Sequence, residues 1–160
     1  MHLVEFNVAR LHAPLDEPSN REFVAALDGV NLVGERADGF VWRLQDDSGR
    51  SSSYITSTDD ANVIVNLTVW ESVEALRDFT YRSGHSAYFR RRREWFEADA
   101  TPRVVCWWIA AGEVPTLEDA SERLEHLRRH GPSERGFPLS QPLPPPTTTT
   151  PEGLRDGTPA

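Results

Sequence analysis

His85 and Tyr81 are the residues of this sequence best suited to acid–base chemistry, and they lie four positions apart in YRSGHSAYF, residues 81–89. An imidazole titrates near neutral pH, so a histidine can accept or donate a proton under physiological conditions. The Ser-Gly pair at 83–84 interrupts the helical pattern just before His85, and helical spacing would place Tyr81 on the same side. We predict His85 as a general acid or base and Tyr81 as a hydrogen-bond donor. The alternative is structural: Tyr81 packs, and His85 caps the second helical segment.

Asn7 and Asn66 are a second candidate pair, because each falls within a segment that alternates like a strand, residues 3–11 and 61–70. In residues 3–11 the alternation puts Val4, Phe6 and Val8 on one face and Glu5, Asn7 and Ala9 on the other. Buried amides need hydrogen-bond partners. The two asparagines either hold a ligand carbonyl or enolate, or satisfy each other and a buried water.

Four tryptophans are candidates for an aromatic pocket wall: Trp42, Trp70, Trp107 and Trp108. Tryptophans in a small chain also build the core or a dimer interface. Because side chains alternate along a strand, Trp107 and Trp108 lie on opposite faces, and only one of them can line a given pocket.

The elements that would position these residues follow the order strand, helix, strand, strand, helix, strand, with a further helix at residues 116–129. This order predicts an α+β, ferredoxin-like antiparallel sheet with helices on one face plus a C-terminal helix. The first helix is expected to start after Ser19 and to end at Gly29. A sheet face carrying Trp70 beside Asn66 and left uncovered would expose apolar surface, so we expect a homodimer.

Composition and charge limit the possible partners. The chain has 160 residues, and its 17 basic residues, all Arg, are outnumbered by 25 acids, which argues against nucleic acid as a partner. It has one cysteine and lacks an apolar run long enough to span a membrane, so we expect a soluble, cytoplasmic protein. The sequence contains no glycine-rich nucleotide motif, and His126 and His130 lack the supporting ligands of a metal site. We therefore predict neither a metal nor a nucleotide cofactor.

Residues 138–160 hold seven of the twelve prolines and four consecutive threonines. Such a segment buries too little apolar surface to offset its ordering entropy. We therefore predict one domain, residues 1–137, followed by a flexible Pro/Thr-rich tail, residues 138–160.

Five segments carry a family resemblance: FVWRLQDD (40–47), VNLTVWES (65–72), YRSGHSAYFRRRREWF (81–96), CWWIAAGEVPTLEDASERL (106–124) and HGPSERGFPL (130–139). Together they resemble an uncharacterised bacterial domain-of-unknown-function family within the dimeric alpha–beta barrel (antibiotic-biosynthesis monooxygenase-like) superfamily. The resemblance implies the dimeric barrel fold. The wider superfamily includes cofactor-free monooxygenases, polyketide cyclases, lactone isomerases and haem-binding degraders.

Three functions follow as hypotheses. The first is a cofactor-free enzyme that cyclises, isomerises or eliminates on a small apolar molecule, such as a natural-product intermediate, through His85 and Tyr81. The second is a monooxygenase in the same pocket, either cofactor-free or with haem bound by His85. The third is a non-enzymatic dimer that binds a ligand or a protein and uses the proline-rich tail as a contact.

Overall fold

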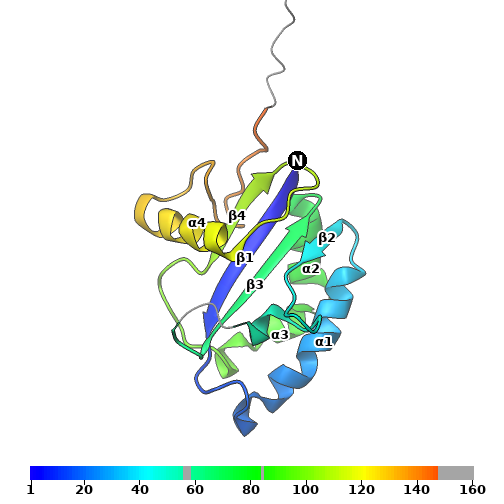
Figure 1. Ribbon diagram of the computed structural model, residues 1–160, viewed down its shortest axis with the longest axis vertical. Helices are drawn as coiled ribbons and strands as arrows, with labels where there is room; N and C mark the ends of the chain where they lie inside the picture. The colour runs from blue at the N-terminus through cyan, green and yellow to red at the C-terminus, as the bar shows by residue number, and fades with distance from the viewer. Residues whose placement is uncertain (56–58, 84, 148–160) are drawn as a thin grey trace, which may run out of the picture.

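The fold is built on one antiparallel sheet of four strands in the order β2–β3–β1–β4 (Figure 1). The computed structural model describes residues 1–55, 59–83 and 85–147, and of His85 it describes the backbone alone. The strands are β1 (His2–Arg10), β2 (Phe40–Arg43), β3 (Val63–Trp70) and β4 (Val104–Ile109). Helices connect β1 to β2 and β3 to β4, which confirms the predicted ferredoxin-like arrangement.

The α-helices of the described residues are α1 (Arg21–Glu35), α2 (Val73–Arg82), α3 (His85–Arg90) and α4 (Leu117–His130). Side-chain caps fix where two of them begin. The Ser72 hydroxyl accepts a hydrogen bond from the Ala75 amide at 3.1 Å, and Thr116 accepts one from the Asp119 amide at 3.2 Å. These contacts satisfy amides that a first helical turn leaves without partners.

The two faces of the sheet differ in chemistry, and helices cover both (Figure 1). The face under α4 is apolar, with Val4, Leu67 and Trp107 buried against Leu124. The opposite face, which we call the α2 face, carries the side chains of alternate residues. These are Leu3, Glu5 and Asn7 of β1, Asn66, Thr68 and Trp70 of β3, and Cys106 and Trp108 of β4.

Two expectations about these elements are wrong. α1 continues through Gly29 to Glu35, because packing on both sides of the glycine, of Phe23 on Trp95 and of Gly34 beside Phe79, outweighs the roughly 1 kcal/mol that a glycine costs a helix. Trp70 does not lie on an uncovered face: it is 1% exposed and stacks on Phe79 of α2, with 5.1 Å between ring centroids. Exposure of Trp70 therefore gives no reason for a dimer, and the homodimer stays a prediction.

The chain after α4 returns to the outer edge of β4. The backbones of Cys106 and Phe137 exchange two hydrogen bonds, of 2.8 and 2.9 Å. Beyond the predicted domain boundary at residue 137, Leu139 is buried, and the carbonyl of Leu143 accepts a hydrogen bond from the Trp108 indole at 2.8 Å. Residues 138–143 thus pack on the sheet, while residues 148–160 of the predicted tail lie outside the described residues.

Candidate active site

A buried carboxylate, that of Glu5, lies at the centre of the α2 face. The side-chain amide of Asn7 donates to Glu5 Oε1 at 2.7 Å. The Asn66 amide and the Thr68 hydroxyl donate to Glu5 Oε2 at 3.3 and 3.1 Å. The strand register explains the grouping, because Glu5 pairs with Thr68 and Asn7 pairs with Asn66 across β1 and β3.

Glu5 is 7% exposed, so its carboxyl group is largely removed from water. Burial raises the pKa of the Glu5 carboxyl above its ordinary value of 4.5, and the hydrogen bonds from Asn7, Thr68 and Asn66 offset that rise in part. Cys106 lies opposite Glu5 on β4, and burial together with the charge of Glu5 raises the pKa of its thiol well above the ordinary value. The thiol is therefore held protonated, which suits an inert packing role.

Thr68 links Glu5 to Trp70. The Trp70 indole N–H donates to the Thr68 hydroxyl at 2.9 Å, and that hydroxyl in turn donates to Glu5. The hydroxyl proton is thereby directed at the carboxylate, since its oxygen is already an acceptor for the indole. Trp70 and Thr68 orient the Glu5 carboxylate.

Apolar clusters lie at both ends of this polar group on the α2 face. One surrounds Trp70, with Leu76 and Phe79 of α2 packed near it. The other surrounds Trp95 and includes Ile64 of β3. Asn7 and Asn66 are half-buried and lie between the clusters. A molecule reaching Glu5 between them would meet amide groups flanked by apolar surface.

The structure thus brings Asn7, Asn66 and Trp70 together around Glu5. Sequence reasoning missed Glu5 as a functional candidate, although the alternation of side chains along residues 3–11 already placed this acid on the same face as Asn7. A charged residue at an inward position of a strand is the signal that would have found it.

The other predicted pair is not brought to this centre by any described contact. Tyr81 is 53% exposed on α2, and its ring meets Phe89 edge-on at 5.9 Å. The predicted helix break is present: α2 ends at Arg82, and His85 begins α3. The side chain of His85 lies outside the described residues, so its role as acid or base stays a prediction.

The remaining tryptophans divide between the faces. Trp107 is fully buried and Trp42 half-buried on the α4 face, away from Glu5. Trp108 lies on the α2 face and packs beside residues 137–143. Its indole is thereby held by the chain segment that follows Phe137.

Within the described residues, no group of three or more His, Cys, Asp or Glu side chains is placed to hold a metal ion. Two open hollows occur near the helices. One, of about 530 Å³, follows β2, and the other, of about 500 Å³, lies between residues 37–39 and α2. Neither is lined by Asn7 or Asn66, so the enclosed cavity predicted to join these asparagines to His85 and Tyr81 corresponds to neither.

Strand order, helix placement and the buried acid define a ferredoxin-like α+β protein with a polar centre on its α2 face. The chain belongs to the family described as a domain of unknown function, DUF3291, whose sequence profile matches residues 2–153. This confirms the family resemblance noted in the sequence. A comparison with curated proteins gives no match.

Several solved structures are similar to this chain. SnoaB, a cofactor-independent oxygenase from Streptomyces nogalater, is 17% identical with a TM-score of 0.48, and the match covers 72% of this chain and 98% of SnoaB. A monooxygenase from the gene ActVA-Orf6 of Streptomyces coelicolor, in complex with nanaomycin D, is 18% identical with a TM-score of 0.45, covering 71% and 92%. A dabb family protein with a ferredoxin-like fold from Mesorhizobium loti is 12% identical with a TM-score of 0.43, covering 70% and 100%.

None of the helices in the described part of the chain has the length and apolar character needed to cross a membrane.

Proposed function

We propose that this protein is a cofactor-free enzyme that moves a proton on a small, largely apolar molecule, with Glu5 as the proton-transfer group. The observation that carries the proposal is the buried Glu5 carboxylate held by three neutral donors, Asn7, Asn66 and Thr68. A carboxyl whose pKa is raised by burial is a stronger base once ionised and holds its proton closer to neutral pH.

The reaction class is abstraction of a proton from carbon next to a carbonyl, followed by isomerisation, cyclisation or elimination. Ionised Glu5 takes the proton, and the electron pair of the C–H bond moves into an enolate. The Asn7 and Asn66 amides, released as Glu5 becomes neutral, donate to the enolate oxygen. Glu5 then returns the proton to another carbon, or the electron pair expels a leaving group.

Oxygenation is the second candidate, because the same enolate is the species that would react with molecular oxygen. Trp70 would act in this step only through Thr68, because its buried indole stacks on Phe79 and helps to orient the Glu5 carboxylate that forms the enolate. Oxygen uptake in the presence of substrate separates oxygenation from simple proton transfer.

The experiment follows exchange of carbon-bound hydrogen for deuterium by NMR, with a panel of enolisable aromatic ketones in D₂O. We expect the wild-type protein to accelerate exchange for part of the panel and Glu5→Gln to lower the rate by at least about 100-fold, the usual contribution of a general base. Glu134→Gln is the matched control, because it removes an exposed carboxylate from the loop after α4. Equal exchange rates for Glu5→Gln and wild type would refute the assignment of Glu5.

Two further variants compare Glu5 with the residues predicted from sequence. If Glu5 is the proton-transfer group, the exposed Tyr81 contributes little and Tyr81→Phe keeps the wild-type rate. If His85 and Tyr81 carry the chemistry instead, folded His85→Ala loses activity while Glu5→Gln keeps it.

A further inference from the structure

Arg43 is a buried guanidinium whose hydrogen bonding is incomplete. It lies on β2 with its side chain 12% exposed, and its Nε donates to Glu35 Oε1 at 2.6 Å. Its Nη1 is buried and has no hydrogen-bond partner among the described residues. Buried polar groups in native proteins are nearly always paired, and an unpaired charged donor is among the least favourable exceptions.

In the part of the chain that the structure describes, a second buried donor without a hydrogen-bond partner lies on α1. Asn31 lies one helical turn before Glu35, and its side-chain Nδ2 is likewise buried and unpartnered within the described residues. Residues four apart share a helix face. The side of α1 that holds Arg43 through Glu35 therefore also carries a donor in need of an acceptor.

The hollow of about 530 Å³ along β2 is lined by both Arg43 and Glu35. Its apolar lining includes Phe40, Trp42 and Leu44, and its polar lining includes Glu35, Arg43 and Gln45. A volume in this range accommodates a small organic molecule. An aromatic body would bury surface against the apolar side chains while an acidic group met the guanidinium.

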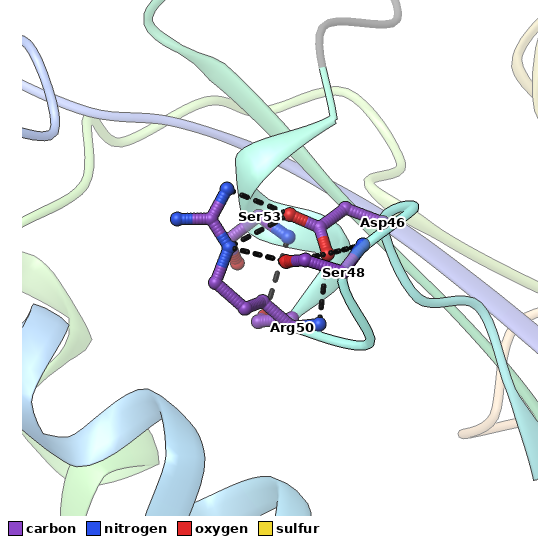
Figure 2. Close-up of polar contacts among 5 residues, drawn as sticks. Asp46, Ser48, Arg50 and Ser53 are labelled. Carbon is purple, nitrogen blue, oxygen red and sulfur yellow. Dashed lines mark hydrogen bonds and ion pairs between the residues drawn. The ribbon is translucent and has the colours of Figure 1, made fainter.

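A tight turn follows Gln45, the last residue that lines the hollow (Figure 2). Asp46, which follows Gln45, accepts hydrogen bonds from the amides of Ser48 and Arg50 at 3.0 and 2.8 Å. Arg50 Nε also donates to Asp46 Oδ2 at 2.8 Å. Desolvation acts to raise the pKa of Asp46, but these hydrogen bonds outweigh it and lower the pKa to about 2. Arg50 is thus held by Asp46, whereas Arg43, which lines the hollow, keeps an Nη1 that no described residue pairs with beside its bond to Glu35.

We propose that the hollow along β2 binds a small organic acid with an apolar body, and that Arg43 Nη1 donates to its acidic oxygen. Glu35 binds the Nε side of the planar guanidinium and leaves Nη1 without an acceptor in the described ranges of the chain. Because Nη1 is buried in this structure, we expect the Arg43 side chain to turn towards the hollow when the acid binds. Arg43 pairs across the sheet with Thr68, which pairs with Glu5. Whether the bound acid is also the substrate rests on the proposed function of Glu5. Binding of the acid to Arg43 is tested separately, by an experiment that needs no enzymatic turnover.

The test uses two fluorescent probes that differ in a single acidic group. 8-Anilinonaphthalene-1-sulfonate is anionic, and N-phenyl-1-naphthylamine is the same aromatic body without the sulfonate. We expect Arg43→Gln to weaken binding of the anionic probe by at least about tenfold, the effect of losing a hydrogen bond to a charged group, and to leave the neutral probe within about twofold. Arg36→Gln, at an exposed arginine next to Glu35, is the matched control and leaves both affinities unchanged.

Glu35→Gln should change the affinity for the anionic probe in the opposite direction, and it tests the proposal even if Arg43→Gln does not fold. It keeps Arg43 and removes the carboxylate that competes for it, so the anionic probe binds about threefold or more tightly than to wild type. Equal weakening of both probes by Arg43→Gln, or an unchanged affinity in Glu35→Gln, overturns the proposal. So does a sedimentation experiment in which wild-type protein self-associates and excludes both probes, because a second copy would then cover the hollow.

Discussion

Replacing Thr68 by valine tests whether the hydrogen-bonded group around Glu5 holds the sheet together as the geometry implies. The substitution keeps the shape of the side chain and removes its hydroxyl. The Thr68 hydroxyl donates to Glu5 at 3.1 Å and accepts from the Trp70 indole at 2.9 Å, and both bonds are buried. Valine can make neither bond, so two partners lose a contact at once.

The magnitude follows from these two bonds. Loss of a donor to a carboxylate costs about 1.5–3 kcal/mol, and a buried indole N–H left without an acceptor costs about 1–3 kcal/mol. The added methyl group returns about 0.8 kcal/mol by burial. We expect Thr68→Val to lower the free energy of unfolding by about 2–5 kcal/mol. Thr68→Ser, the matched control, keeps the hydroxyl and loses one methyl group, for a cost of about 1 kcal/mol.

Equilibrium unfolding in urea at pH 7, followed by tryptophan fluorescence, measures the difference. The double variant with Glu5→Gln adds a second readout, because the cost of Thr68→Val should shrink once the charged acceptor is gone. If Thr68→Val and Thr68→Ser lose the same stability, the hydroxyl does not bridge Glu5 and Trp70 in solution.

Three other predictions concern the pH dependence, a glycine and the C-terminal segment. Because the pKa of Glu5 is raised in the folded protein, its favourable contribution is fully present below the ordinary value of 4.5 and is lost as pH rises through the folded pKa. We expect the free energy of unfolding of Glu5→Gln, measured relative to that of wild type, to increase as pH rises through this range. A difference between the two proteins that does not change with pH would contradict the raised pKa of Glu5. Gly39→Ala should destabilise by more than about 2 kcal/mol in a thermal melt, because φ is +78° and a Cβ would lie 2.6 Å from that of Ala75; a loss below 0.5 kcal/mol would show that the turn relaxes. Truncation after residue 147 should leave the melting temperature unchanged, whereas truncation after residue 137 should lower it by removing Leu139 and the acceptor of the Trp108 indole; equal melting temperatures would mean that residues 138–143 do not pack.

Alternation along the strands was sufficient to predict which residues share a face. It placed Asn66 and Trp70 together on β3, and the register of β1 against β3 then brought Asn7 opposite Asn66. The break before His85 was also visible, because serine and glycine end helices through local backbone preferences.

Features that depend on distant contacts were not predictable in the same way. Gly29 favours the end of a helix locally, but α1 continues because residues on both sides of this glycine are packed: Phe23 contacts Trp95, and Gly34 lies beside the Phe79 ring. The burial of Trp70 depends on where α2 lies, which strand alternation alone does not specify. The composition of residues 138–143 is typical of a solvated tail. Their packing depends on two contacts with β4: the backbone pairing of Phe137 with Cys106, and the hydrogen bond from the Trp108 indole to the Leu143 carbonyl.

The charges on the α2 face explain why Glu5 can keep a raised pKa although a guanidinium occupies the same cross-strand row. Arg43 lies on β2, with β3 between it and Glu5, and its Nε is bound to Glu35 of α1. The contacts that lower the pKa of Glu5 come from the neutral donors Asn7, Thr68 and Asn66. A direct ion pair with Arg43 would favour the ionised acid and make Glu5 a weak base. With β3 between the two described side chains and Arg43 bound to Glu35, no such ion pair opposes the proton transfer proposed for Glu5, and Nη1 of Arg43 is left for the proposed ligand.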